Sequence, residues 1–246
     1  MKRKNLINNK IKGYSIIKKL GEGRYGIVYL GRNMLGEKVV IKQLKKPMAR
    51  MLGEKIIYEA KILQNLNDDR FPKFIGKFRN KYGQGYILQY IKGKTFENIL
   101  FEDQYEFSKE EIYTITDKLL EIVSILDKNN IVHKDIRVPN VIQKPDKELV
   151  LIDFGLARFI DNVKYTKDMD FWFIGDFLIH LYYSSYKENN NEEKPWYEEL
   201  ELLPKENLFL KKLMEIEGKY NSIEEIKKDF IEVKEEYFSL LKQMIK

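Results

Sequence analysis

The first 90 residues alternate between short apolar runs and turns that contain glycine. Runs rich in β-branched and aromatic residues are typical of strands. Such runs occupy residues 14–20, 27–31, 38–44, 74–78 and 85–91. Residues 55–66 differ, because Ile56, Ala60 and Leu63 recur there at helical spacing. We therefore expect the front of the chain to form a sheet accompanied by one helix.

From Ser108 onward the pattern is mainly helical. Ser108 and Glu111 have the spacing of a capping box, and so do Ser222 and Glu225 before a last helix that runs to the C-terminus. The helix after Ser108 carries apolar residues on one face, at Ile112, Ile115, Leu119 and Ile122. Two short apolar runs and two helical patterns follow, at residues 141–142, 149–152, 169–183 and 208–217.

A strand-rich front and a helical back indicate an α+β fold with two lobes. We expect a basic N-terminal tail at residues 1–12, a small β-rich lobe at 13–92 and a helical lobe at 93–246. A polar loop at 187–194, K-E-N-N-N-E-E-K, interrupts the helical part.

The composition is that of an ordinary folded protein. Of 246 residues, 43% are hydrophobic and 33% charged, which argues against disorder. Cysteine is absent and the two histidines, His133 and His180, lie far apart, so disulfides and thiolate or histidine-rich metal sites are excluded. The longest apolar stretch, 171–183, is too short to cross a bilayer, and the N-terminus lacks the apolar part of a secretion signal. We therefore expect a cytoplasmic protein without a membrane segment.

The net charge of +6 changes this picture only slightly. Acidic residues are interleaved with the lysines and arginines almost throughout, so no continuous basic stripe is present. This pattern favours a solvated surface with a local anion site, and we expect no nucleic-acid partner.

The segment Gly21-Glu22-Gly23-Arg24-Tyr25-Gly26 lies between two expected strands. Glycines at these positions let backbone amides approach a phosphate chain, because no Cβ atom stands in the way. A dinucleotide-binding fingerprint would open directly into a helix, whereas this segment runs into another strand. Taken alone, it is either a tight turn or a phosphate-binding loop.

A lysine and a glutamate further along the chain are candidates to accompany this loop. Lys42 ends the apolar run Val39-Val40-Ile41, and a lysine at a strand end is usually solvated. Glu59 lies one helical turn from the apolar Leu63, so its carboxylate sits beside the inward face of the expected helix. An ion pair between Lys42 and Glu59 could hold the ammonium group against phosphates.

The most informative segments are His133-Lys134-Asp135-Ile136-Arg137-Val138-Pro139-Asn140 and Asp153-Phe154-Gly155. Asp135 and Asn140 stand five residues apart beside a proline that blocks a helix, and together they offer a base and a metal ligand. Asp153 leaves an apolar strand into a glycine turn, where a carboxylate suits Mg²⁺ because hard cations prefer oxygen donors. A single aspartate could equally be a cap or a turn residue.

Five elements have now been named: the glycine-rich segment, Lys42, Glu59, and the segments 133–140 and 153–155. In this order and spacing they resemble the protein kinase superfamily, and the resemblance covers residues 13 to about 183. It implies ATP as phosphate donor and Mg²⁺ as metal, with Lys42 holding the α- and β-phosphates and Glu59 holding Lys42. The glycines that would cover the phosphates are Gly21, Gly23 and Gly26. The residues that would surround the adenine are Val28, Val40, Leu88 as gatekeeper, Gln89, Ile91 and Ile142.

The resemblance also assigns roles to the second half of the chain. Asp135 would be the catalytic base that accepts the proton of the acceptor hydroxyl, and Asn140 and Asp153 would hold Mg²⁺. Arg137 stands where Ser/Thr kinases place a lysine that meets the γ-phosphate. Asp170 would support the catalytic loop from the start of a central helix.

Three features depart from the family pattern. Only fourteen residues separate Gly155 from Asp170, and no A-P-E is recognisable. Lys134 replaces the arginine that clamps a phosphorylated activation loop in many kinases. About 60 residues follow the central helix, so the helical lobe is trimmed. In these respects the chain is similar to small atypical kinases of the RIO type and to small-molecule phosphotransferases of the same fold.

Three functions therefore remain open. We favour an ATP- and Mg²⁺-dependent enzyme that phosphorylates serine or threonine in a protein substrate, without activation-loop control. The alternatives are a small-molecule phosphotransferase and a catalytically silent scaffold that binds nucleotide. The scaffold is disfavoured because all residues needed for the chemistry are present.

Overall fold

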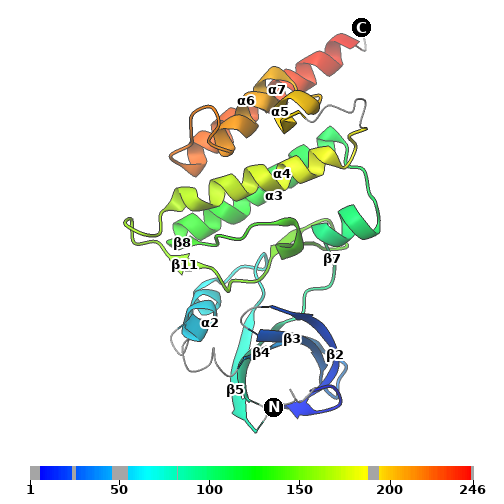
Figure 1. Cartoon of the computed structure of the whole chain (residues 1–246), viewed down its shortest axis with the longest axis vertical. Coiled ribbons are helices and arrows are strands. Elements are labelled where there is room, and N and C mark those ends of the chain that lie inside the picture. The colour runs from blue at the N-terminus through cyan, green and yellow to red at the C-terminus, as the bar shows by residue number, and fades with distance from the viewer. Residues whose placement is uncertain (1–5, 24–25, 46–54, 82, 188–193, 245–246) are drawn as a thin grey trace. The chain divides into compact units, whose positions relative to one another are not determined.

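The computed structural model describes residues 6–23, 26–45, 55–81, 83–187 and 194–244 (Figure 1). The chain forms two compact units, residues 1–92 and 93–246. The first unit is rich in strands and the second in helices, so the expected α+β class is confirmed. Most of the polar loop expected at 187–194 lies outside the described residues.

The first unit is built on a six-stranded antiparallel sheet with the order β1-β2-β3-β4-β6-β5. Helix α2 (Lys55–Asn65) lies in the connection from β4 to β5. Apolar side chains on one face of the sheet form a common core. The strands are β1 (Lys10–Ile11), β2 (Tyr14–Glu22), β3 (Gly26–Arg32), β4 (Lys38–Leu44), β5 (Phe74–Asn80) and β6 (Gly83–Gln89).

The N-terminal residues 6–12 belong to this first unit, and do not form the separate basic tail that we expected. Leu6 and Ile11 are fully buried in the same core as Tyr29 and Ile41. Strand β1 also pairs with β2. The basic residues around Leu6 and Ile11 suggested a solvated segment, but burial of two large aliphatic side chains stabilises the packed arrangement.

The second unit is dominated by helices that pack on one another. Helix α3 contacts α4 and α7, and α6 contacts α4 and α7. The Glu206 carboxylate is buried among α3, α4 and α6, where it accepts hydrogen bonds from Tyr113 (2.5 Å), Tyr182 (3.0 Å) and Lys109 (2.7 Å). The helices are α3 (Lys109–Lys128), α4 (Phe171–Tyr183), α5 (Trp196–Glu199), α6 (Pro204–Leu213) and α7 (Ile223–Met244).

One helix start was predicted closely, whereas another helix is shifted. Ser108 and Glu111 form the reciprocal capping box that opens α3, as expected. The helix expected at 208–217 is instead α6, which starts at Pro204 and ends at Leu213. Proline suits the first turn of a helix, and Glu215 takes a left-handed conformation (φ 57°) that ends it.

Short strands complete the second unit and shape its loops. Strands β7 (Lys94–Thr95), β9 (Val141–Gln143) and β10 (Leu149–Leu151) form a small antiparallel sheet with the order β10-β9-β7. Strand β8 (Ile131–Val132) pairs with β11 (Arg158–Phe159). None of the helices in the described part of the chain has the length and apolar content needed to cross a membrane.

Candidate functional site

The glycine-rich segment forms the hairpin between β2 and β3 in the first unit. Gly21 pairs with Val28, and the Gly23 N–H donates to the Gly26 carbonyl at 3.0 Å. A Cβ atom on Gly26 would lie 2.4 Å from the Gln43 carbonyl oxygen, so this position requires glycine. A Cβ on Gly21 or Gly23 would meet no atom within 4 Å. These two glycines therefore leave open space beside the backbone, whereas Arg24 and Tyr25 lie outside the described residues.

A cluster of charged side chains fixes one side of this hairpin. Lys45, directly after β4, donates to the Gly23 carbonyl at 2.7 Å and pairs with Glu22 at 3.0 Å. Lys19 also donates to Glu22, at 2.7 Å. These two ammonium groups lower the pKa of Glu22 to about 2, and the carboxylate therefore stays charged at neutral pH.

Lys42 and Glu59 form the expected ion pair within the first unit. The Lys42 Nζ lies 2.7 Å from the Glu59 Oε1, and the Glu59 side chain is only 5% exposed. The Tyr86 hydroxyl donates to the other oxygen, Glu59 Oε2. Tyr86 was not among the predicted site residues. It lies directly opposite Lys42 in the β4–β6 register, which places the two side chains on the same face of the sheet.

The strand register also places most of the expected adenine-contacting side chains together. Val28 lies opposite Lys42, and Val40 lies opposite Leu88. Because side chains alternate along a strand, Val28, Val40 and Leu88 share the face that carries Lys42. Strand β6 ends at Gln89, whose N–H donates to the Lys73 carbonyl at 2.9 Å. Ile91 follows in the connection, and Ile142 is a buried residue of β9 in the second unit.

In the second unit, Asp135 is held from both of its carboxylate oxygens. Arg137 Nε donates to Oδ1 at 2.5 Å, and Asn140 Nδ2 donates to Oδ2 at 2.7 Å. Asn140 Nδ2 also lies 2.9 Å from the Asp135 carbonyl oxygen. A short turn of 3₁₀ helix, Val138–Asn140, brings the asparagine back toward the aspartate. The hydrogen bond to Asp135 raises the pKa of Arg137, so this side chain remains a cation.

Asp170 holds the backbone immediately before Asp135. Its two oxygens accept hydrogen bonds from the His133 N–H at 2.7 Å and the Lys134 N–H at 2.6 Å. Lys134 has a left-handed backbone (φ 66°), which these contacts stabilise. The expected support of the loop by Asp170 is therefore present in the structure. Burial of the carboxyl group raises the pKa of Asp170 to about 6.

Asp153 follows strand β10 in a left-handed conformation (φ 64°) and is exposed. The preceding Ile152 N–H donates to the Asn140 carbonyl at 2.8 Å, which ties the end of β10 to the loop that carries Asp135. The next residue, Phe154, is fully buried, and its ring meets the His133 ring edge to face at 4.7 Å. Asp153, Asn140 and Asp135 are thus positioned by one connected group of contacts within the second unit.

The segment after Asp153 is anchored by an aspartate and by a tyrosine. Asp161 Oδ1 accepts the backbone N–H groups of Val163, Lys164 and Tyr165 at 2.8–3.0 Å, which lowers the Asp161 pKa. The Tyr165 ring lies near three cations, with its centroid 4.6 Å from Lys134 Nζ, 5.4 Å from Lys164 Nζ and 5.9 Å from Arg158 Cζ. Contacts of this kind stabilise a cation over an aromatic face.

The buried Asp170 predicts that folding stability falls as the pH rises from about 4 to about 6, because the folded protein then binds a proton that the unfolded chain releases. The raised pKa of Asp170 corresponds to a loss of about 3 kcal/mol in the free energy of unfolding between pH 4 and pH 6. Asp170→Asn has no proton to lose, so its free energy of unfolding should lack this component. Urea unfolding at several pH values measures the difference between the two proteins. A difference that stays constant across this window would contradict the prediction.

Comparison with known proteins gives a family for this arrangement. The protein kinase domain model matches residues 14–184. The probable serine/threonine-protein kinase YbdM of Bacillus subtilis (strain 168) is 36% identical over 224 residues, which cover 88% of this chain and 87% of that protein. A probable casein kinase II subunit alpha homolog of Encephalitozoon cuniculi (strain GB-M1) is 29% identical over 216 residues, covering 74% of this chain and 64% of that protein. The chain belongs to the protein kinase family.

Proposed function

We propose that this kinase uses ATP and Mg²⁺ to phosphorylate serine and threonine hydroxyls in a protein substrate. The observation that carries the proposal is the loop in which Asp135 is fixed by Asn140 while Asp170 fixes the backbone before it. A base must be held in one orientation to accept a proton from a hydroxyl group. The name of the Bacillus subtilis relative, a probable serine/threonine-protein kinase, supports the same acceptor class.

In the first unit, Lys42 is the proposed ligand of the α- and β-phosphates. Glu59 keeps its ammonium group in place, and the Tyr86 hydroxyl keeps the Glu59 carboxylate in place. The open backbone at Gly21 and Gly23 allows close approach of phosphate oxygens. The adenine would lie on the apolar residues that share this sheet face, with the Gln89 and Ile91 backbone at its edge.

In the second unit, Asp135 is the proposed catalytic base. It accepts the proton of the acceptor hydroxyl while the hydroxyl oxygen forms its bond to the γ-phosphorus and the bond to the ADP oxygen breaks. Arg137, half-exposed beside Asp135, is the proposed counter-charge for the γ-phosphate. Its present hydrogen bond to Asp135 holds the base until the phosphate competes for the guanidinium group.

The donor set at Asn140 and Asp153 fits Mg²⁺, because an amide oxygen and a carboxylate are hard ligands. When bound, Mg²⁺ neutralises charge on the phosphate oxygens. No group of three or more acidic, histidine or cysteine side chains within the described ranges forms a metal site by itself. Two protein ligands completed by phosphate oxygens and water agree with the usual coordination of Mg²⁺.

Labelled ATP and Mg²⁺, with the enzyme alone and with generic protein acceptors, provide the direct test. We expect label in protein, and phosphoamino-acid analysis should recover phosphoserine or phosphothreonine. ATP turnover that leaves all protein unlabelled would replace the proposal with a small-molecule phosphotransferase. Nucleotide binding without turnover would replace it with a scaffold, and phosphotyrosine alone would refute the acceptor class.

The Lys42–Glu59 ion pair predicts strongly non-additive effects on turnover. Lys42→Ala and Glu59→Ala should each lower kcat/KM, and the double variant should be little worse than Lys42→Ala. The reason is that Glu59 acts only by holding Lys42, so its loss has no further effect once the lysine is absent. A double-mutant cycle on kcat/KM measures this, with Lys38→Ala on the same strand as a control. Additive losses would show that the two side chains act separately.

We further propose that the enzyme is active as synthesised. Tyr165 and Thr166 are the only hydroxyl residues between Gly155 and Asp170. The Tyr165 ring contacts the Lys134 ammonium group, with 4.6 Å between Lys134 Nζ and the ring centroid. The variant Tyr165→Phe/Thr166→Ala keeps an aromatic ring and should retain the wild-type kcat, whereas Tyr165→Ala should lose activity.

Phosphatase-treated enzyme, untreated enzyme and both variants are compared at saturating ATP. A tenfold loss of kcat after phosphatase treatment or in Tyr165→Phe/Thr166→Ala, about 1.4 kcal/mol in the barrier, would refute activity without phosphorylation.

A further inference from the structure

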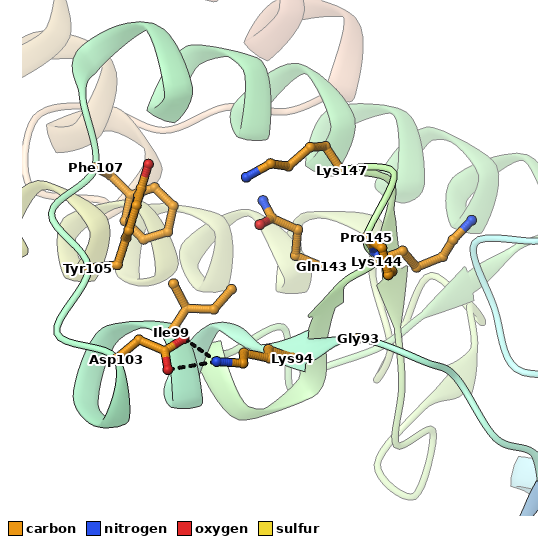
Figure 2. A pocket seen from close by; sticks show the side chains of 10 residues that line it. All are labelled: Gly93, Lys94, Ile99, Asp103, Tyr105, Phe107, Gln143, Lys144, Pro145 and Lys147. Carbon is orange, nitrogen blue, oxygen red and sulfur yellow. Dashed lines mark hydrogen bonds and ion pairs between the residues drawn. The ribbon is translucent and has the colours of Figure 1, made fainter.

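A cavity in the second unit lies outside all the residues assigned above. Its volume is about 300 Å³, within the range of sites that accept a single small ligand or side chain. Figure 2 shows it between the β9–β10 hairpin, strand β7 and the segment that leads to α3. The lining residues are Gly93, Lys94, Ile99, Asp103, Tyr105, Phe107, Gln143, Lys144, Pro145 and Lys147.

One wall of the cavity is aromatic and fixed in place. The rings of Tyr105 and Phe107 meet edge to face with centroids 4.9 Å apart. Phe107 is buried and stacks on Phe96 at 5.8 Å, and the Tyr105 hydroxyl donates to Glu111 at 2.7 Å. Tyr105 is nevertheless 42% exposed, so its ring can contact a ligand without leaving this position.

The opposite wall presents one cation and one amide. In Figure 2 the Lys147 ammonium group and the Gln143 carboxamide both reach toward the two rings. The structure records no hydrogen-bond or ion-pair partner for either group among the residues it describes. Lys94, in contrast, is held by both oxygens of Asp103 at 2.7 Å, and Lys144 pairs with Asp146 at 3.1 Å. Lys147 is therefore the lysine of this cavity that is available to a ligand.

The two strands behind the polar wall are closely packed, so the backbone that lines this side of the cavity is held in place. A Cβ atom on Gly93 would lie 2.3 Å from the Gln143 carbonyl oxygen, so only glycine allows β7 to approach β9 here. Lys118 on α3 donates to the Lys147 carbonyl at 2.8 Å and to Glu148 at 2.7 Å, which fixes the hairpin. A preformed site loses less entropy on binding than one that must be ordered by its ligand.

The charges and shape of the lining define the ligand chemistry. Among the described residues, Lys94 is paired with Asp103 and Lys144 with Asp146, so Lys147 gives the lining its one uncompensated positive charge. Lys147 suits a carboxylate, the Tyr105 and Phe107 rings suit an apolar side chain, and the Gln143 carboxamide offers both a donor and an acceptor. A peptide group needs one of each, and a bare carboxylate needs only donors.

We propose that this cavity is a docking site for an acidic peptide segment with one apolar side chain, carried by the protein that the kinase phosphorylates. The apolar side chain lies against Tyr105 and Phe107, the peptide backbone pairs with Gln143, and a flanking carboxylate pairs with Lys147. The assignment to the acceptor protein rests on the proposed function, whereas the binding of the peptide does not.

Direct binding tests the site without any phosphoryl transfer. A fluorescein-labelled peptide, Glu-Glu-Phe-Glu-Glu, is titrated with the intact chain and followed by anisotropy, beside Glu-Glu-Ser-Glu-Glu and Lys-Lys-Phe-Lys-Lys. We expect saturable binding of the first peptide, about tenfold tighter than either control, since each control lacks one of the two complementary groups. Absence of saturable binding, preference for the basic peptide, or equal competition by phenylacetate would overturn the proposal.

Matched variants locate the binding. Lys147→Gln and Tyr105→Ala should each lower the affinity for the acidic peptide by about five- to tenfold. The first variant loses the positive charge, and the second loses the apolar wall. Lys144→Gln on the same hairpin should leave binding unchanged, since that side chain is engaged with Asp146. Wild-type affinity in Lys147→Gln, or equal losses in Lys147→Gln and Lys144→Gln, would place the peptide elsewhere. Thermal unfolding of each variant confirms that it is folded.

A second arm tests the role in catalysis. A serine acceptor peptide is joined by a flexible linker to Glu-Glu-Phe-Glu-Glu or to its serine counterpart. We expect a lower KM for the first peptide with an unchanged kcat, and Lys147→Gln should remove this difference while keeping wild-type activity on a generic acceptor. Binding without this KM effect would refute the assignment to the acceptor. If no acceptor is phosphorylated at all, the proposed function is refuted. The binding experiment remains valid in that case, because it does not depend on phosphoryl transfer.

Discussion

Asp135→Ala is expected to lower the kcat of phosphoryl transfer by about a thousandfold, within the range that a positioned general base contributes. The affinity for ATP should not change, because Asp135 addresses the acceptor hydroxyl rather than the nucleotide. Its carboxylate is already fixed by Arg137 and Asn140, so the alanine removes a base whose orientation the fold maintains. Single-turnover transfer of labelled phosphate measures kcat, and calorimetry measures the dissociation constant of ATP.

Asp127→Ala, on the last turn of α3, is a matched control, because that aspartate lies outside the proposed machinery. Its kcat should equal that of the wild type. A large loss of ATP affinity in Asp135→Ala would contradict the proposed division between the nucleotide and acceptor residues. Near-native turnover in the same variant would remove Asp135 from the mechanism.

Asp153→Asn is expected to reduce Mg²⁺-dependent transfer by at least a hundredfold, about 3 kcal/mol in the barrier. The amide carries no charge for the metal, whereas the fold should be retained. Asp153 has a left-handed backbone (φ 64°), and asparagine is the residue that tolerates this conformation best after glycine. Alanine at the same position would combine the chemical change with backbone strain.

The measurement is turnover across a titration of Mg²⁺, accompanied by the Mg²⁺ dependence of nucleotide binding. In the variant, nucleotide binding should lose most of its response to Mg²⁺. Asp168→Asn, in the turn before α4, serves as the control for an aspartate-to-asparagine change. Wild-type turnover at all Mg²⁺ concentrations would show that Asp153 does not hold the metal.

Local patterns in the sequence correctly predicted several elements that depend on neighbouring residues. Strand β4 occupies the expected residues 38–44, because a β-branched run bounded by polar residues determines it. The capping box at Ser108 and Glu111 depends on two side chains three residues apart. The Lys42–Glu59 pair was also found, since the helical spacing placed Glu59 beside the inward face.

The features that the sequence did not reveal depend on contacts between distant segments. Tyr86 reaches Glu59 only because β4 and β6 pair in the register that sets Lys42 opposite Tyr86. The end of α6 is a separate case, because it is set by the local left-handed backbone of Glu215, which no residue pattern predicted. The roles of Asp135, Arg137, Asn140 and Asp153 in catalysis stay predictions until turnover is measured.

The packing of the N-terminal residues and of α7 bears on how this kinase can be shortened. The stretch that matches the family model is residues 14–184. Buried core residues lie both before and after this stretch. Trimming to it would remove Leu6 and Ile11 from the first unit and Phe209 and Phe230 from the second, all of them buried. Burial of each such side chain contributes about 1.5–3 kcal/mol to the free energy of unfolding. The loss of all four would therefore remove a large part of the total stability of a typical domain. The minimal autonomous folding unit therefore extends beyond the region that sequence likeness defines.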